Sequence, residues 1–373
     1  TPNVVDLTNF IGASIGETST DGYMAVMGGI AAISKFTTYE NIEINVDINN
    51  SASVDKSVLG GVAGMYVYAQ SGSDNNKPYL NQDIKVSVPS GKKVTGGTSI
   101  GGVFGETKKD GSNNQTKSDL LISNVNVKRL EAAGTGAAGN ETVNIYWGGV
   151  IGKSNLCNGS VLKIVNATAS VVLVDLNAKA GTYNYFVGGI AGYAGCDNTT
   201  NVGNGDDLFL TLKNSNTSGN IKIWGKSFLE QLISASIGGL VGTAMLATEE
   251  NAIAGNTSSI RINYDIDSPN STATKVTGTV SIGGAFGAAS MYNTSGVVLK
   301  LSGLNYNGSL AVKDYGINTY VGGIIGRFPL IDNSGNSQIA FNDVHVKPSG
   351  NITTLLQYTY MNAGFASTAY IGR

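Results

Sequence analysis

Charged residues are scarce in this sequence. Asp, Glu, Lys and Arg make up 13% of its 373 residues, about half of the usual share. The 24 basic and 26 acidic residues nearly balance, and no run of Lys or Arg predicts the basic patch of a nucleic-acid-binding protein. Histidine occurs once, as His345, and its alternation with Val344 and Val346 predicts a solvent-facing side chain. This pattern argues against a histidine-based triad and against a multi-histidine metal site.

Proline and long apolar runs are also rare. Six prolines beside 51 glycines exclude collagen, which needs abundant proline and glycine at every third position. No stretch reaches 18 uninterrupted apolar residues, so no transmembrane helix is predicted. Hydrophobic residues still make up 41% of the chain, enough for a packed core, which excludes wholesale disorder.

A repeated glycine string is the main feature that is present. Eight copies have the form apolar-Gly-Gly-apolar-apolar-Gly or a close variant, and a degenerate ninth is read at 362–366. The spacings between first glycines are 32, 41, 47, 40, 50, 45 and 39 residues, with a mean of 42. Such a period indicates a solenoid or a propeller with loops of variable length. The strings are MGGIAA (27–32), LGGVAG (59–64), IGGVFG (100–105), WGGVIG (147–152), VGGIAG (187–192), IGGLVG (237–242), IGGAFG (282–287) and VGGIIG (321–326).

The segments between the strings alternate with period two, which is typical of half-buried strands. Residues 41–49 and 260–266 place aliphatic or aromatic side chains on one face and polar ones on the other. A shorter alternating run, such as 221–224, follows in most repeats, and we read the glycine string as a third strand. The sequence therefore predicts an all-β, three-faced parallel β-helix of about eight coils. A propeller and tandem β-sandwiches remain the alternatives.

The strings resemble the GLUG motif, a short Gly-Gly-Leu-Val-Gly repeat of large secreted and surface-anchored proteins, many of them adhesin-like. The string at 237–242 comes nearest, whereas most copies carry Val, Ile or Ala in place of the motif's leucine. The resemblance implies an extracellular repeat scaffold and carries over no catalytic residues.

Read as flat strands, the glycine strings are apolar on both faces. The residue that follows the two glycines is nearly always aliphatic and is expected to form a ladder inside the rod. The opposite face is also apolar, so inserted loops or a partner must cover it. A partner would make this face an assembly surface. Its residues are Ile100, Phe104, Trp147, Ile151, Val187, Ile237, Val241, Phe286 and Ile325.

Few residues suggest catalysis. Asp265 and Asp267 lie two apart on one strand face, and Asp206 is adjacent to Asp207. A carboxylate pair of this kind flanks a sugar in glycosidases or binds calcium. A polar outer strand face and a turn are the simpler interpretations. We therefore expect no enzyme activity, no catalytic residues, no cofactor and no metal.

Two cysteines occupy nearly the same place in consecutive coils. Cys157 lies nine residues after Gly148, and Cys196 lies eight after Gly188. Stacking would bring their Cα atoms to roughly 5 Å, within the range of a disulfide. We predict a Cys157–Cys196 bridge, with two free thiols as the alternative.

Asparagine is frequent, and twelve copies lie in Asn-x-Ser/Thr sequons, an excess that suggests a secreted glycoprotein. Chance in an Asn- and Thr-rich chain is the alternative. The sequon residues are Asn49, Asn114, Asn140, Asn158, Asn166, Asn198, Asn216, Asn256, Asn270, Asn293, Asn307 and Asn351.

These observations predict one β-helix domain over 1–373, with degenerate capping coils at 1–32 and 350–373. The leading functional hypothesis is an extracellular or cell-surface structural or adhesive protein, with a subunit of a surface filament or layer as one form of it. It would associate with itself, with other surface proteins or with glycans. The alternatives are a carbohydrate-active β-helix enzyme and a carbohydrate-binding module.

Overall fold

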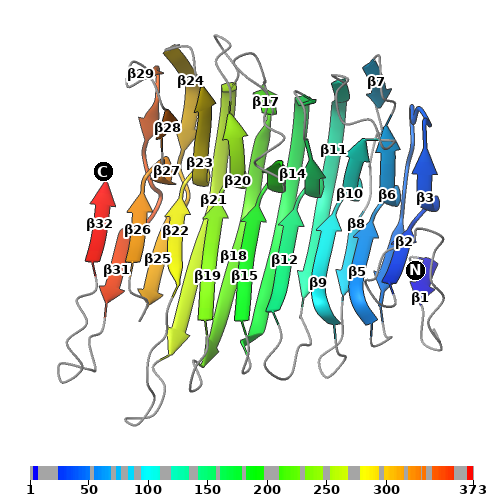
Figure 1. Cartoon of the computed structure of the whole chain (residues 1–373), viewed down its shortest axis with the longest axis horizontal. Helices are drawn as coiled ribbons and strands as arrows, with labels where there is room; N and C mark the ends of the chain where they lie inside the picture. The colour runs from blue at the N-terminus through cyan, green and yellow to red at the C-terminus, as the bar shows by residue number, and fades with distance from the viewer. Residues whose placement is uncertain are drawn as a thin grey trace.

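The computed structural model is built from β-strands and contains no helix among the residues that it describes. Figure 1 shows the strands side by side along the long axis, with their colours in chain order from the N-terminus at one end to the C-terminus at the other. The described residues are 3–6, 24–50, 54–68, 73–76, 83–87, 94–109, 119–133, 142–156, 160–178, 182–196, 210–226, 232–246, 253–267, 278–293, 298–314, 318–328, 330–332, 338–356 and 368–372.

The strands form three sheets, here named A, B and C, in which every pairing is parallel. Sheet A contains β1 (Asn3–Asp6), β4 (Val46–Asn49), β7 (Ser73–Asn76), β8 (Asp83–Ser87), β11 (Asp119–Ala133), β14 (Val161–Ala178), β17 (Leu210–Lys213), β18 (Asn216–Lys226), β21 (Ile253–Asp267), β24 (Val298–Tyr306), β25 (Ser309–Asp314), β29 (Gln338–Asn342), β30 (His345–Val346) and β31 (Ile352–Leu356).

Sheets B and C contain nine strands each, and each glycine string joins a strand of one to a strand of the other. Sheet B contains β2 (Met24–Gly28), β5 (Val54–Gly60), β9 (Val94–Gly101), β12 (Thr142–Gly148), β15 (Thr182–Gly188), β19 (Leu232–Gly238), β22 (Thr279–Gly283), β26 (Asn318–Gly322) and β32 (Thr368–Gly372). Sheet C contains β3 (Ala31–Lys35), β6 (Ala63–Tyr68), β10 (Phe104–Lys109), β13 (Ile151–Asn155), β16 (Ala191–Gly195), β20 (Val241–Leu246), β23 (Phe286–Asn293), β27 (Ile325–Arg327) and β28 (Leu330–Asp332).

Each repeat is one turn of a solenoid. The chain passes from β11 in sheet A to β12 in sheet B and β13 in sheet C, then returns to sheet A at β14, beside β11. The first glycines of all eight strings pair with one another in register, as Gly148 does with Gly101 and Gly188. The prediction of an all-β fold with stacked parallel strands is therefore confirmed.

The interpretation of the glycine string as a strand is wrong. In Trp147–Gly152 the first two residues end β12, Gly149 and Val150 form a bend, and β13 begins at Ile151. The string is thus the corner between sheets B and C. Its glycines are needed for space, because a Cβ on Gly149 would lie 2.1 Å from the Gly189 carbonyl oxygen and 2.7 Å from the Ala169 Cβ.

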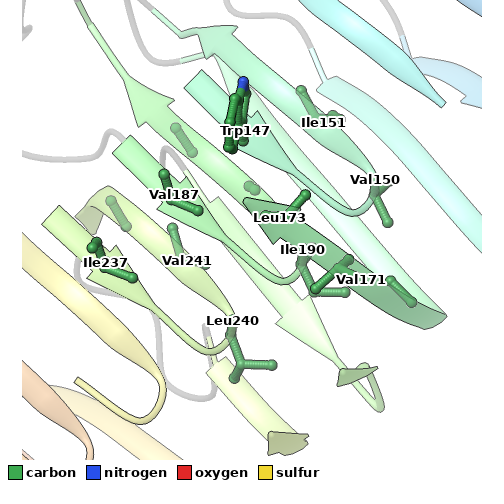
Figure 2. Packing of buried hydrophobic residues seen from close by; sticks show 14 of the residues in the cluster. Trp147, Val150, Ile151, Val171, Leu173, Val187, Ile190, Ile237, Leu240 and Val241 are labelled. Atoms are coloured by element: carbon green, nitrogen blue, oxygen red, sulfur yellow. The ribbon is translucent and has the colours of Figure 1, made fainter. Parts of the chain in front are cut away.

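The residue that follows the two glycines of each string forms the predicted aliphatic ladder. Val103, Val150, Ile190 and Leu240 are fully buried, and their backbone groups bond from coil to coil. Val103 donates to Val150 over 2.9 Å, Val150 to Ile190 over 2.8 Å, and Ile190 to Leu240 over 2.7 Å. Figure 2 shows Val150, Ile190 and Leu240 in a row along successive corners.

A second corner bends sheet A. Asn124, Asn166 and Asn214 have left-handed backbones, with φ of 54°, 54° and 48°. Their side chains form a ladder in which Asn166 Nδ2 donates to Asn124 Oδ1 over 3.1 Å and Asn214 Nδ2 donates to Asn166 Oδ1 over 3.4 Å. Asparagine tolerates this conformation better than other side chains do, which explains its recurrence here. Gly255 and Gly303, with φ of 63° and 69°, adopt it in the next two coils.

The ninth string was misplaced. Gly372 at the end of β32 pairs with Gly322, so Ile371 and Gly372 occupy the string position of this coil. The segment 362–366 lies outside the described residues. The described part of the first coil also keeps the common register, since Gly28 pairs with Gly60. Capping by 1–32 and 350–373 stays a prediction.

The corner glycines generate a stability prediction. Replacing Gly149 with Val should destabilise the fold by about 3 kcal/mol or more, because the added carbons have no space and overpacking is costly. Chemical denaturation followed by circular dichroism measures the loss. Gly350→Ala is the matched control, since its Cβ would meet only the Ser309 side chain, at 3.0 Å and beyond. Equal stability of the two variants would contradict a tight corner.

Candidate functional site

The predicted assembly face is wrong, because its residues lie in the core. Eight of the nine side chains are fully buried, and Ile325 is half-buried against the same core. The corner explains the error: it turns the chain between two sheets, so that Trp147 from β12 and Ile151 from β13 both point inward (Figure 2). The buried eight are Ile100, Phe104, Trp147, Ile151, Val187, Ile237, Val241 and Phe286.

Sheets B and C face each other beyond the corner, and aromatic side chains fill part of the space between them. Tyr146 of β12 stacks on Phe186 of β15 with ring centroids 5.0 Å apart and planes 7° apart. Tyr193 of β16 meets both rings edge-on, at 5.9 and 5.6 Å. Lys153 Nζ of β13 lies 4.9 Å from the Tyr146 ring centroid. These rings contact each other, so they act chiefly in holding sheet B against sheet C.

An ion pair bridges the same two sheets nearer the N-terminus. Lys56 Nζ of β5 lies 2.6 Å from Glu106 Oε2 of β10, and the Glu106 side chain is nearly buried. A small apolar cluster of Val26, Val58, Met65 and Val67 lies between the same two sheets. The contacts between sheets B and C are therefore structural.

The outer face of sheet A displays polar side chains on three neighbouring strands, β18, β21 and β25. On β18 the residues Ile221 and Ile223 are buried, whereas Asn220, Lys222 and Trp224 are exposed. On the neighbouring β21 the same alternation places residues 261, 263 and 265 outward. We name this surface the Trp224 face. It consists of Asn220, Lys222 and Trp224 of β18, Arg261, Asn263 and Asp265 of β21, and Lys313 of β25.

The strand register places these side chains in rows across the coils. Trp224 is paired with Asp265, and Asp265 with Lys313. Lys313 Nζ lies 3.3 Å from Asp265 Oδ1, so this carboxylate is partly neutralised. Lys222 and Arg261 are exposed, and no ion pair joins either to another described residue. The face thus combines an indole, free cations and amide groups.

The candidate carboxylates do not form a described catalytic pair. Asp265 contacts Lys313, and the side chain of Asp267 lies outside the described residues, as do Asp206 and Asp207. His345 is exposed, as expected, with its Nε2 2.8 Å from Asp343 Oδ1. Among the described residues there is no cluster of three or more His, Cys, Asp or Glu side chains arranged to hold a metal. The same part of the chain has no helix long and apolar enough to cross a membrane.

The sequons differ in accessibility. Asn256 is fully buried, accepts from the Ser215 backbone N–H and donates to the Leu212 carbonyl, so it is not available to a glycan in the folded chain. Asn49 is half-buried. The exposed sequon residues are Asn166, Asn216, Asn307 and Asn351. The side chains of Asn114, Asn140, Asn158, Asn198, Asn270 and Asn293 lie outside the described residues.

Comparison with known proteins identifies no relative. No protein-family model, no curated protein and no solved structure matches the chain. Functional inference consequently depends on the arrangement of its own residues.

Two buried tyrosines form hydrogen bonds in the core, one between sheets B and A and one within sheet A. Tyr185 of β15 donates to Asp175 Oδ2 of β14 over 3.0 Å, and both residues are buried. Burial, reinforced by the charge of Asp175, raises the pKa of Tyr185 well above its usual value. Burial also raises the pKa of Tyr306, which donates to the Ile260 carbonyl over 3.1 Å.

These tyrosines predict a loss of stability in alkali. Above pH 10 the unfolded chain loses the tyrosine protons that the folded chain retains, so the free energy of unfolding falls as pH rises. Each tyrosine contributes a slope of up to about 1.4 kcal/mol per pH unit. Urea denaturation between pH 9 and 12 measures this slope. Tyr306→Phe should make it shallower, and an unchanged slope would contradict the assignment.

The cysteine bridge stays a prediction, because Cys157 lies outside the described residues. Leu156 donates to the Gly195 carbonyl over 2.7 Å, so the residues that precede the two cysteines are hydrogen-bonded neighbours. We expect no alkylation of the native, unreduced protein by intact mass, and two alkylated thiols after reduction. Reduction should cost roughly 4 kcal/mol, as closure of a loop of about 40 residues implies. Two reactive thiols before reduction would contradict the bridge.

Proposed function

We propose that this chain is an extracellular structural or adhesive repeat protein, a stiff β-helix that presents its outer sheet faces to a surface. The observation that carries the proposal is the unbroken register of the glycine corners over all eight strings. Such stacking maintains an elongated scaffold whose loops and outer faces are free to vary. The resemblance to GLUG repeats supports an extracellular location.

The finer architecture belongs to the same proposal. We infer one three-faced domain over 1–373, with about eight coils and degenerate coils at both ends. In this interpretation the bend at the asparagine ladder lies within one face. The partners are other surface proteins, glycans or further copies of the chain.

Carbohydrate binding without catalysis is the second candidate function. The Trp224 face favours it, because an exposed indole beside amide and charged groups is suited to hold a sugar ring and its hydroxyls. A carbohydrate-active enzyme is less favoured, because Asp265 is engaged by Lys313.

An adhesion measurement tests the proposed function. Beads coated with the folded chain should stay attached to immobilised extracellular-matrix or polysaccharide layers under a flow that removes beads coated with the heat-unfolded chain. Negative-stain images of the same preparation should show rods or fibres. Retention no greater than that of the unfolded control would contradict the adhesive role, and compact particles would contradict the stiff scaffold.

A parallel assay addresses catalysis. Incubation of the chain with the same polysaccharides should release no reducing ends and no unsaturated products. Release that disappears in Asp265→Asn would overturn the non-catalytic interpretation in favour of the enzyme.

A further inference from the structure

We propose that the Trp224 face binds an anionic polysaccharide, one that carries carboxylates on its sugar rings. This inference rests on the proposed adhesive function and specifies the ligand class of one outer face. The face lies on β18, β21 and β25 of sheet A, and its central side chain is Trp224.

The position of Trp224 along the solenoid does not account for its exposure. Among the described residues, five large hydrophobic side chains are exposed, and four of them lie in the end coils, where no further described coil covers them. Phe341, for example, is 54% exposed, whereas Leu301, its partner one coil inward, is fully buried. Trp224 is 36% exposed although β18 has a paired strand on either side. It is exposed because it points outward from a middle coil.

The surroundings of Trp224 select a ligand. Strands lie about 4.8 Å apart, and alternate residues along a strand about 6.6 Å apart. Lys222 therefore lies one step from Trp224 along β18, and Lys313 two strands away, about 10 Å. Arg261 pairs with Asn220 at the far end of the face. These spacings suit an extended chain of sugars better than one small molecule.

The charge of the face favours an acidic ligand. It contains three cations, Lys222, Arg261 and Lys313, against one carboxylate, Asp265, which Lys313 already contacts. Lys222 and Arg261 have no ion-pair partner among the described residues, so both remain available for charge-assisted hydrogen bonds to carboxylates. Trp224 would supply the apolar contact with a ring face, and Asn220 and Asn263 the hydrogen bonds to hydroxyls.

Other aromatic groups are less suitable for this role. Tyr146 and Phe186 stack on each other, Tyr193 packs at a steep angle to both rings, and Lys153 Nζ lies over the Tyr146 ring. A ligand would have to displace these contacts between sheets B and C. The indole on sheet A requires no such rearrangement, because its strand is already fixed by Ile221 and Ile223 in the core.

Binding to polygalacturonate tests the proposal, with its methyl ester as a polymer of the same backbone without charge. The full chain should bind polygalacturonate, measured by affinity electrophoresis or calorimetry, and bind the ester at least fivefold more weakly. Trp224→Ala should weaken binding at least fivefold. Lys222→Gln combined with Arg261→Gln should weaken it and also flatten its dependence on salt, because exposed charges are screened.

Lys213→Gln combined with Lys347→Gln is the matched control, since both lysines are exposed but lie outside the Trp224 face. This variant should bind as the parent chain does, and all variants should keep the parent circular dichroism and melting temperature. Equal binding of the ester, no effect of Trp224→Ala, or equal binding of polyglutamate would overturn the proposal. Beads that adhere while polygalacturonate does not bind would sink this inference and leave the adhesive function standing.

Discussion

Every coil of this protein must pass the corner between sheets B and C, where neighbouring backbones lie closer than side chains allow. A Cβ on Gly152 would lie 2.6 Å from the backbone nitrogen of Ile100 and 2.7 Å from the Tyr146 carbonyl oxygen. Parallel pairing repeats this close approach at each level, so the requirement recurs once per coil. The loops carry no such requirement, and this difference explains spacings that range from 32 to 50 residues around an almost constant string.

The two corners solve different problems with different residues. At the glycine corner the neighbouring backbones leave no space for a Cβ, so the position requires glycine. At the bend of sheet A the obstacle is a left-handed backbone, which Asn124, Asn166 and Asn214 adopt while their amides bond along the axis. Axial side-chain bonds offset part of the cost of that conformation, whereas glycine at Gly255 and Gly303 avoids the cost but forms no such bond.

Periodicity in the sequence was sufficient to predict stacked parallel strands, because alternation and the repeat length are local signals. Periodicity did not predict where the side chains of Trp147 and Ile151 point. In a flat strand they would lie on the face opposite the ladder residue Val150, whereas the observed corner places both of them in the core. The asparagine bend also has a sequence signal, because Asn recurs at the positions where the alternation breaks. The alternation of 221–224 already placed Trp224 outward, but only the register with β21 and β25 assembled the cations around it.

The difference between inward and outward side chains bears on function. A β-helix core consists of columns in which each member is covered by the next coil, so an inward substitution disturbs three coils at once. An outward residue of sheet A contacts only its neighbours on the same face, and the fold places little demand on its identity. The aromatic residues between sheets B and C are accounted for by packing against one another. The exposure of Trp224 is not accounted for in this way. A large apolar side chain beside the exposed polar residues of β18 and β21 is best explained by a contact with a ligand outside the molecule.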